Sequence, residues 1–510
     1  MIPVPGFEGR RVAVFGLGRS GITAARALEA GRAVPILWDD GVSGRMQAEA
    51  EGFTLEDLTV ADWSSFDALV LSPGAPLTHP KPHWTVDKAH EAGLPVMGDV
   101  ELFARALDSL PAAERPRVVA ITGTNGKSTT TALIASVLKS AGMKVHMGGN
   151  IGIGVLALPA PTPEAVYVIE VSSYQLDLTT SFTPDVAILT NVSPDHLDRH
   201  GGMDGYVKAK SRIFQAMKSD GIALIGVDDD WGRGLAKGLA DRVTTVTTSP
   251  SPLGGEGGSR SETDEGAGGH LSDAQPVTSA TPHPRPADPP VANSQCELAP
   301  PPRGEGIFAW PGKLIIDGET IVLTPARSLP GRHNAQNAAF AYGAARALGL
   351  SHDQAVRGIL SFPGLAHRME AVGRLGSVRF INDSKGTNAD AAYQALASYS
   401  TSYWIAGGVA KAGGIEPLRP LFGHVAKAYL IGQAADEFAA ALADVPHVVA
   451  GTMEQAVRMA AADAAAAGGD QVVLLSPACA SFDQFPDFEV RGEAFRAAVL
   501  ALGAMPEASL

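Results

Sequence analysis

The sequence predicts an α/β fold of three domains, each built around a mostly parallel β-sheet. Short runs rich in Val, Ile and Leu alternate with Ala-rich helical stretches along the chain. This alternation is typical of parallel strands that are covered by helices. The 510 residues are too many for one core, because a domain commonly holds roughly 150 residues.

Composition excludes several classes of protein. Apolar residues make up 45% of the chain and charged residues 18%, so most of it can bury a core. The net charge of −14 is the opposite of what a general nucleic-acid binder carries, and we expect no nucleic-acid partner. Cys296 and Cys479 are too few for a disulfide framework or a Cys-rich zinc site. Without a signal-like start or a long apolar run, we expect a cytoplasmic protein with no membrane partner.

Breaks in composition divide the chain. Residues 249–306 hold eleven prolines and nine glycines without any aromatic residue or Ile, so they cannot pack a core. We interpret them as a disordered insert between two strands; a partner-binding segment is the alternative. Shorter Pro- or Gly-rich breaks lie at 110–117 and 326–334. We therefore predict domains at 1–112, 113–325 and 326–510.

The first domain opens with a glycine-rich fingerprint. The strand RVAVF leads into a G-x-G-x-x-G segment at Gly16–Gly21 and then a helix, and the next strand, VPILW, ends at Asp39. This arrangement indicates a Rossmann-like domain that binds a pyrophosphate at a helix N-terminus. The ligand can be NAD or another nucleotide with a pyrophosphate and a ribose, and a turn that merely packs the helix is the remaining alternative. Ser72 follows the strand DALVL at the same predicted edge.

The second domain contains a phosphate loop. After the strand VVAIT comes Gly123-Thr124-Asn125-Gly126-Lys127-Ser128 and then a helix. Backbone amides and the Lys127 ammonium suit phosphate oxygens, and the Ser128 hydroxyl can ligate Mg²⁺. The loop is shorter than G-x-x-x-x-G-K-[ST], since Ile121 stands at the first position of that pattern. We predict a domain like the phosphate-loop ATPases.

Polar residues end the following strands. AVYVIE ends in Glu170, and VAILTN is followed by a loop with His196. Because ligands bind at the carboxyl ends of parallel strands, we expect both side chains near the phosphate loop, where they suit Mg²⁺ and a second metal ion. A helix-capping carboxylate and a satisfied loop histidine are the alternatives.

The third domain repeats the pattern and is predicted to be Rossmann-like. SVRFI, SYWIA and QVVLL each end in a polar or glycine-rich loop. Arg368, Lys385 and Lys411 lie in or near such loops, where cations suit phosphate or carboxylate; a solvated surface lysine is the alternative for Lys411. Cys479 has no nearby His and is interpreted as a small buried residue.

The motifs taken together resemble the Mur ligase family. They are TGTNGKST, GGNIG, EVSSYQLD, NVSPDHLDRHG, GRHNAQN, HRME, NDSKGTN and SPACASFDQFPDFEVRG. The resemblance covers all three domains outside the insert. It implies an ATP-dependent ligase of cell-wall peptidoglycan synthesis that adds D-glutamate to UDP-N-acetylmuramoyl-L-alanine through an acyl phosphate, and we expect a monomer. The absence of a DNPR motif argues against the members that add diaminopimelate or lysine.

The resemblance also implies roles for individual residues. Those expected to bind ATP are Gly123, Thr124, Asn125, Gly126, Lys127, Ser128, Thr129, Asn334, Asn337, Arg368 and Asp383. Those expected to bind the UDP substrate or the amino acid are Gly18, Arg19, Ser20, Asp39, Ser72, Asn150, Thr387, Lys411, Ser481 and Phe488. The implied catalytic residues are Lys127, Glu170, His196, Lys210 and Lys385, and the implied ligands of two Mg²⁺ ions are Ser128, Glu170, His196 and Lys210.

Lys210 is the implied carbamylated lysine. The residues alone predict only a solvated helix lysine there. Two positions depart from the family pattern: Val409 replaces an acidic residue of GGxxK, and Phe482 replaces a Leu in a mostly packing role. The rival interpretations are an NAD oxidoreductase, a folylpolyglutamate-type or other Mur-type ligase, and an ATP-binding regulatory module.

Overall fold

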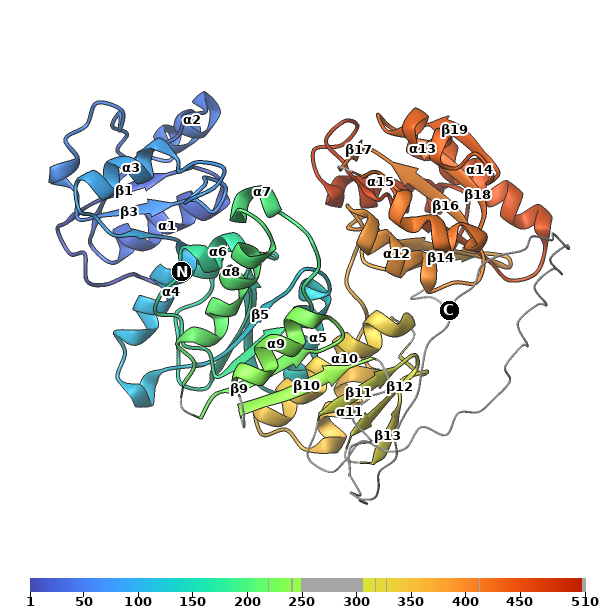
Figure 1. Ribbon diagram of the computed structural model, residues 1–510, viewed down its shortest axis with the longest axis horizontal. Helices are drawn as coiled ribbons and strands as arrows, with labels where there is room; N and C mark the ends of the chain where they lie inside the picture. The colour runs from blue at the N-terminus through green and yellow to red at the C-terminus, as the bar shows by residue number, and fades with distance from the viewer. Residues whose placement is uncertain are drawn as a thin grey trace, which may run out of the picture.

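The computed structural model describes residues 1–218, 220–239, 242–248, 306–316, 318–326, 328–411 and 413–506. These residues form three main sheets, one per domain, and the predicted α/β class is confirmed. Figure 1 shows the first domain (blue) and the third domain (orange to red) on opposite sides of the central domain (green to yellow). The predicted insert, apart from Gly306, lies outside the described residues.

The first domain has a parallel four-stranded sheet in the order β2-β1-β3-β4. Its strands are β1 (Arg11–Phe15), β2 (Val34–Trp38), β3 (Ala68–Leu71) and β4 (Val96–Met97). Its helices are α1 (Arg19–Ala30), α2 (Val42–Ala50), η1 (Trp63–Ser65), α3 (Trp84–Glu91), α4 (Asp99–Asp108) and η2 (Ala112–Glu114). The turn between β1 and α1 requires glycine, because Gly16 has a φ of +88° and a Cβ there would lie 2.4 Å from the Ser72 Cβ.

The central sheet has nine strands in the order β13-β12-β11-β10-β9-β8-β5-β7-β6, and all neighbours are parallel except that β12 is antiparallel to both β11 and β13. Its strands are β5 (Arg117–Thr122), β6 (Lys144–Gly149), β7 (Ala165–Glu170), β8 (Val186–Leu189), β9 (Ile222–Gly226), β10 (Val243–Thr247), β11 (Ile307–Trp310), β12 (Lys313–Ile316) and β13 (Glu319–Val322). Its helices are α5 (Lys127–Ser140), η3 (Val155–Ala157), α6 (Ser173–Asp177), α7 (Leu197–His200), α8 (Met203–Gln215), α9 (Asp230–Leu239), α10 (Gly331–Ala347) and α11 (His352–Leu360). Strands β10 and β11 flank the predicted insert.

The third domain has a seven-stranded sheet in the order β19-β18-β16-β20-β15-β14-β22, in which β14 is antiparallel to both of its neighbours, β15 and β22. Its strands are β14 (Glu370–Leu375), β15 (Val378–Asn382), β16 (Ser402–Gly407), β17 (Val409–Ala410), β18 (Val425–Ile431), β19 (His447–Gly451), β20 (Gln471–Leu475), β21 (Cys479–Ala480) and β22 (Met505–Pro506). Its helices are α12 (Ala389–Ala397), η5 (Glu416–His424), α13 (Ala435–Ala441), α14 (Met453–Ala467) and α15 (Phe488–Ala501). Strands β17 and β21 form a separate pair.

The domains differ in how they share cores. One continuous apolar core runs from the first domain into one face of the central sheet, where the rings of Phe103 and Tyr167 lie 5.5 Å apart. The other face of the central sheet is covered by α5, α10 and α11, while the third domain has two core clusters of its own. The predicted boundary at residue 326 would place α10 and α11 in the third domain, but both helices pack on the core of the central domain. We propose a boundary between Phe362, in the central core, and Met369, in the third-domain core.

Candidate active site

The phosphate loop connects β5 to α5 at the carboxyl edge of the central sheet. Gly126 precedes the helix with a φ of +82°, and a Cβ there would lie 2.7 Å from Asn337 Oδ1, so the close approach of α10 requires glycine. The Lys127 ammonium donates to the carbonyl oxygens of Gly123 and Thr124, at 2.9 and 2.8 Å. Burial lowers the pKa of Lys127, and the neighbouring Glu170 carboxylate opposes that effect. The loop therefore presents a partly buried cation at a helix N-terminus.

Glu170 lies beside this loop at the end of β7. Its Oε2 accepts a hydrogen bond from Ser128 Oγ at 2.5 Å, and its Oε1 accepts from Asn150 Nδ2 at 2.9 Å. Burial works against the ionised carboxyl, but Lys127 and Arg368 outweigh it, and the pKa of Glu170 is lowered. Arg368 of the third domain donates to the same Ser128 hydroxyl at 2.5 Å. Glu170 caps no helix, so that alternative is wrong.

Lys210 is buried against the phosphate loop. It lies on α8, where its Nζ donates to the Gly123 carbonyl at 2.7 Å and stands 4.4 Å from the centre of the Tyr206 ring. Burial, followed by the nearby Lys127 charge, places the pKa of Lys210 well below its ordinary value. The prediction of a solvated helix lysine, made from the residues alone, is wrong because this face of α8 packs on the loop.

His196 lies on the loop that follows β8, with a left-handed backbone φ of 53°. The loop packs on the phosphate loop, since Thr124 Oγ1 donates to the Ser193 carbonyl at 3.1 Å. The half-buried imidazole has an Nε2 3.4 Å from an oxygen of Asp195, whose other oxygen lies 3.6 Å from Lys411 Nζ. Burial lowers the pKa of His196, which favours the neutral imidazole.

Two asparagines of α10 reach the same loop. Asn337 Oδ1 accepts from the Thr130 hydroxyl at 3.0 Å, and Asn337 Nδ2 donates to Asn334 Oδ1 at 3.0 Å. Both side chains are buried. Thr129, in the first turn of α5, is half-buried, and Asn125 N donates to Asn191 Oδ1 at 2.9 Å. The predicted ATP residues of the central domain therefore lie around one helix N-terminus.

A cavity of about 190 Å³ joins the first and central domains. It is lined by Gly18, Arg19, Ser20, Ser72, Pro73, Gly74, Gly149, Asn150 and Gln175. Five predicted substrate residues from two domains therefore line one cavity. Asp39 does not line it: its two carboxylate oxygens accept from the backbone amides of Leu17 and Gly41, at 2.6 and 2.7 Å, so Asp39 holds the glycine-rich turn.

In the third domain, Asp383 and Lys385 lie on the loop after β15. Asp383 accepts from Ser476 Oγ at 2.8 Å and from the Met369 amide at 3.2 Å, and burial raises its pKa to about 7. Lys385 Nζ lies 3.7 Å from the centre of the Phe488 ring, and burial lowers its pKa to about 8. The loop therefore carries two groups that can exchange protons near neutral pH.

The remaining predicted third-domain residues lie on neighbouring loops. Thr387 is half-buried and its amide donates to the Lys385 carbonyl at 2.7 Å, while Ser481 is buried. Val409 pairs with Ala480 in the small sheet. Phe482 is 75% exposed, so the prediction of a packing role is wrong.

Cys479 is buried and free, and burial raises its pKa to about 12, which agrees with an unreactive core thiol.

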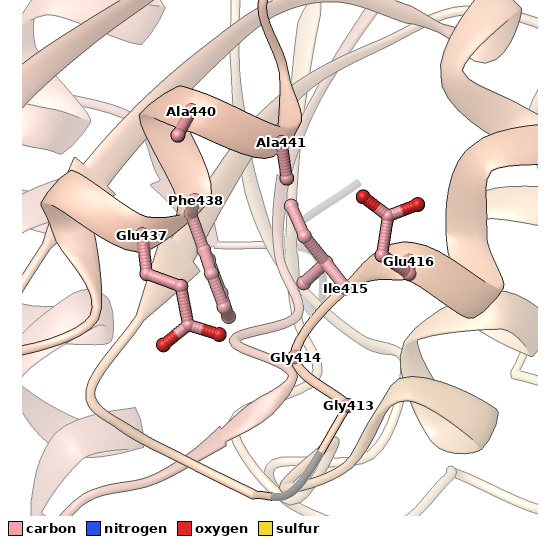
Figure 2. Close-up of a pocket in the computed structure, with 8 residues that line it drawn as sticks. All are labelled: Gly413, Gly414, Ile415, Glu416, Glu437, Phe438, Ala440 and Ala441. Atoms are coloured by element: carbon pink, nitrogen blue, oxygen red, sulfur yellow. The ribbon is translucent and has the colours of Figure 1, made fainter.

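A larger cavity of about 310 Å³ lies elsewhere in the third domain (Figure 2). It lies between the segment Gly413–Glu416 and the helix α13, with Ile415 and Phe438 among its lining residues and the carboxylates of Glu416 and Glu437 at its rim. Glu416 is already paired with Arg419 at 2.9 Å. None of the residues predicted from the sequence lines this cavity.

Several contacts of the site carried no clear sequence signal. Tyr206 lies 3.1 Å from Thr124 Oγ1, and nothing in its helix distinguishes it from a core residue. Arg491 is buried and donates to the Ser384 and Cys479 carbonyls, at 2.8 and 3.0 Å. Gln175 is the exception, because the spacing of Ser172 and Gln175 is that of a capping box, which the structure contains.

Within the described residues, no helix combines the length and apolarity that a membrane span requires. The same residues contain no cluster of three or more His, Cys, Asp or Glu side chains suited to a metal ion. Mg²⁺ in nucleotide sites commonly takes one or two protein oxygens and completes its shell with phosphates and water. The adjacent oxygens of Ser128 and Glu170 fit that kind of site.

Fold and site together define a three-domain α/β protein with a nucleotide-type phosphate loop. Residues 121–255 match the model of the Mur ligase middle domain, and residues 367–479 match that of the Mur ligase glutamate ligase domain. The UDP-N-acetylmuramoylalanine–D-glutamate ligase of Caulobacter vibrioides (strain NA1000 / CB15N) is 55% identical over 99% of this chain and 98% of that protein. The protein of the same name from Agrobacterium fabrum (strain C58 / ATCC 33970) is 47% identical over 99% of this chain and 98% of that protein.

Solved structures share the fold. UDP-N-acetylmuramate-alanine ligase from Thermotoga maritima has a TM-score of 0.55 at 14% identity, over 97% of this chain and 100% of that one. A pseudomurein peptide ligase type C from Methanothermus fervidus has a TM-score of 0.52 at 17% identity, over 97% of this chain and 100% of that one. The chain belongs to the Mur ligase family, and the predicted resemblance is confirmed.

Proposed function

We propose that the protein is an ATP-dependent ligase that adds D-glutamate to UDP-N-acetylmuramoyl-L-alanine in peptidoglycan precursor synthesis. The observation that carries this proposal is the convergence of Lys127, Ser128 and Glu170 with Arg368 of another domain, in a chain 55% identical to a protein of that named activity. A carboxylate is a poor electrophile. Its conversion to an acyl phosphate by ATP provides the leaving group that an amine can displace.

The cavity between the first two domains is the proposed site of the UDP substrate. The helix α1 begins at Arg19, so its free amides face the pyrophosphate side of the cavity. Asn150 lines the cavity and also donates to Glu170. This arrangement supports a substrate that extends from the first domain toward the phosphate loop, with its carboxylate nearest Glu170.

The proposed phosphoryl-transfer site is the phosphate loop. Lys127, Arg368 and the loop amides neutralise phosphate charge, and Asn334 and Asn337 hold the nucleotide from α10. Ser128 and Glu170 would hold one Mg²⁺, and His196 and Lys210 a second. When bound, the two ions supply electrostatic stabilisation of the charge that builds on the transferred phosphoryl oxygens.

Lys210 is the proposed carbamylated lysine. Its lowered pKa favours the neutral amine, the form that attacks CO₂ with formation of an N–C bond and loss of a proton. An ammonium there would add a buried cation beside Lys127. A carbamate instead provides two oxygens of the opposite charge, which suit Mg²⁺.

The amino-acid site is proposed on the third-domain loops. D-glutamate carries two carboxylates, and Lys385 and Lys411 are the proposed cations that bind them. Lys411 Nζ lies 3.6 Å from Asp195 of the central domain, which supports a site at this boundary. Thr387, Ser481 and Phe488 complete the proposed site. Asp383, whose pKa is raised to about 7 by burial, can accept the proton that the attacking amine loses. We further propose that the protein acts as a monomer in the cytoplasm.

The test is ADP release by the purified protein with ATP, Mg²⁺ and UDP-N-acetylmuramoyl-L-alanine, and with D-Glu, L-Glu, L-Ala or L-Lys in parallel. We expect release and amide formation with D-Glu alone. Equal turnover with another amino acid would reassign the specificity. No amide with any of them, or turnover without the UDP substrate, would refute the proposal.

A further inference from the structure

Arg199 connects the wall of the nucleotide cavity to the loop that carries His196. Its Nη1 donates to the Gly74 carbonyl at 2.9 Å, and its Nη2 donates to the Pro73 carbonyl at 3.3 Å. Pro73 and Gly74 both line the 190 Å³ cavity. Arg199 itself belongs to the central domain, three residues after His196, so the contact crosses the domain boundary.

One face of the Arg199 guanidinium lies on an aromatic ring. The Arg199 Cζ stands 4.5 Å from the centre of Tyr174, whose ring lies 5.0 Å from that of His196. Tyr174 also stacks on His200 at 5.5 Å. The guanidinium is thus held between the cavity wall and the tyrosine ring that lies against His196 at an interplanar angle of 53°.

Hydrogen bonds fix this cluster to α6. His200 Nδ1 lies 3.0 Å from Asp177 Oδ2, and its Nε2 lies 3.0 Å from Ser173 Oγ; the His200 ring is buried and the Asp177 side chain is 21% exposed. The helix α6 also carries Gln175, which lines the cavity. The His196 loop and the cavity therefore share one short, well-anchored helix.

A second contact brings the same two loops together. Gly201 follows His200 with a φ of +69°, and a Cβ there would lie 2.5 Å from His79 Nε2 of the first domain. The loop after β3 therefore packs closely on the segment after α7, independently of Arg199. Such packing leaves little freedom for one loop to shift without the other.

We propose that Arg199 is a positioning residue that couples binding of the UDP substrate to the arrangement of the His196 loop. When the substrate binds, Pro73 and Gly74 are held in one conformation. Their carbonyls then hold the Arg199 guanidinium against the Tyr174 ring, and Tyr174 holds the His196 ring in place. The proposal rests on the proposed function for the identity of the cavity's ligand. Because coupling is reciprocal, an Mg²⁺-nucleotide complex bound at the His196 side must tighten the UDP substrate by the same factor.

The test is calorimetric binding of UDP-N-acetylmuramoyl-L-alanine to the full-length protein, with and without Mg²⁺ and a non-hydrolysable ATP analogue. In the wild type we expect the analogue to lower the Kd by roughly 5-fold or more, within the usual range of coupling. In Arg199→Ala the factor should fall to less than half of its wild-type value, with the remainder carried by the close packing of His79 on Gly201. The Kd without analogue should rise about 10-fold, as expected when charge-assisted hydrogen bonds are lost. Arg199→Lys, which keeps the charge without the fork, should recover only part of the coupling.

Arg212→Ala is the matched control. Arg212 donates from Nη1 to the carbonyls of Asp177 and Thr179, at 3.0 and 3.3 Å, so it makes the same kind of contact within one domain. We expect this variant to keep the wild-type coupling factor even if its stability falls. Wild-type coupling in Arg199→Ala, or equal loss of coupling in Arg212→Ala, would overturn the proposal. A wild-type protein that fails to bind the UDP substrate would instead refute the proposed function.

Discussion

The boundary between the first and central domains is held together differently from the boundary between the central and third domains. The former shares a continuous apolar core and the hydrogen bonds that the buried Glu101 carboxylate accepts from Thr180 and Ser181. The latter joins separate cores through polar pairs, among them Ser193 with Asp390 at 3.0 Å and Lys411 with Asp195 at 3.6 Å.

This difference assigns different tasks to the two boundaries. Breaking the first would expose apolar surface and leave buried polar groups unpaired, so the first two domains behave as one rigid platform. The second is made of contacts that water replaces at little cost. The phosphate loop lies at that second boundary, where Arg368 meets Ser128. We therefore expect the third domain to close on the platform during the reaction.

The largest expected effect is that of Lys127→Ala on catalysis at the second boundary. Removal of one well-placed cation should lower kcat by on the order of 10²–10³-fold, by analogy with the loss of one transition-state donor. Steady-state ADP release measures this effect. Lys139→Ala changes an exposed lysine of the same helix and should leave kcat unchanged. Wild-type turnover in Lys127→Ala would show that the loop has another role.

Lys210→Ala tests whether the buried lysine provides more than packing. We expect a loss of activity that small added carboxylates partly restore, because they can occupy the place of the carbamate. Lys208→Ala, an exposed lysine of α8, should be fully active with or without them. Full activity of Lys210→Ala without any addition would refute the carbamate.

Glu101→Gln probes the first boundary. The side chain is 2% exposed and accepts the amides of Thr180 and Ser181 at 2.8 and 2.9 Å. We expect the free energy of unfolding to fall by about 2–4 kcal/mol in urea denaturation at pH 7, since a buried charge-assisted network is lost. Glu91→Gln, at a carboxylate that is 69% exposed, is the control and should change it little.

The same variant makes a pH prediction. Burial opposes ionisation of Glu101, but the Thr180 and Ser181 hydrogen bonds outweigh it and lower the pKa. A carboxyl with a depressed folded pKa contributes stability above its unfolded pKa, and that contribution is lost as the pH falls through the folded pKa. The stability gap between wild type and Glu101→Gln should therefore narrow below about pH 4. A gap that stays constant down to pH 2 would contradict this account.

The smallest expected effect on stability is that of Lys411→Ala at the second boundary. Its ion pair is 45% exposed on the lysine side, so the free energy of unfolding should change by less than about 1 kcal/mol. The KM for D-glutamate should nevertheless rise, because the lysine is proposed to bind a carboxylate. Lys427→Ala, on β18, removes a comparable pair with Asp463 of α14 and should change neither quantity appreciably. A large loss of stability in Lys411→Ala would mean that the second boundary is as firm as the first.

The sequence by itself determined the class of fold, the positions of several strands of each sheet and the phosphate loop. VPILW and AVYVIE became β2 and β7 without a change of bounds, and Lys127 begins α5 as the motif requires. These features follow from neighbours in the chain, because side-chain period and glycine placement act locally.

The tertiary structure alone decided which distant residues meet. Lys210 lies 87 positions along the chain from Gly123, and Arg368 lies 240 positions from Ser128. Contacts at such sequence separations cannot be read from the spacing of residues in a strand or helix. The packing of α10 and α11 on α5 supports the proposed boundary after Phe362, and the exposure of Phe482 contradicts its predicted packing role. Local patterns specify where each sheet begins and ends, whereas the way that sheets and helices pack on one another decides which side chains become buried and which face a neighbouring domain.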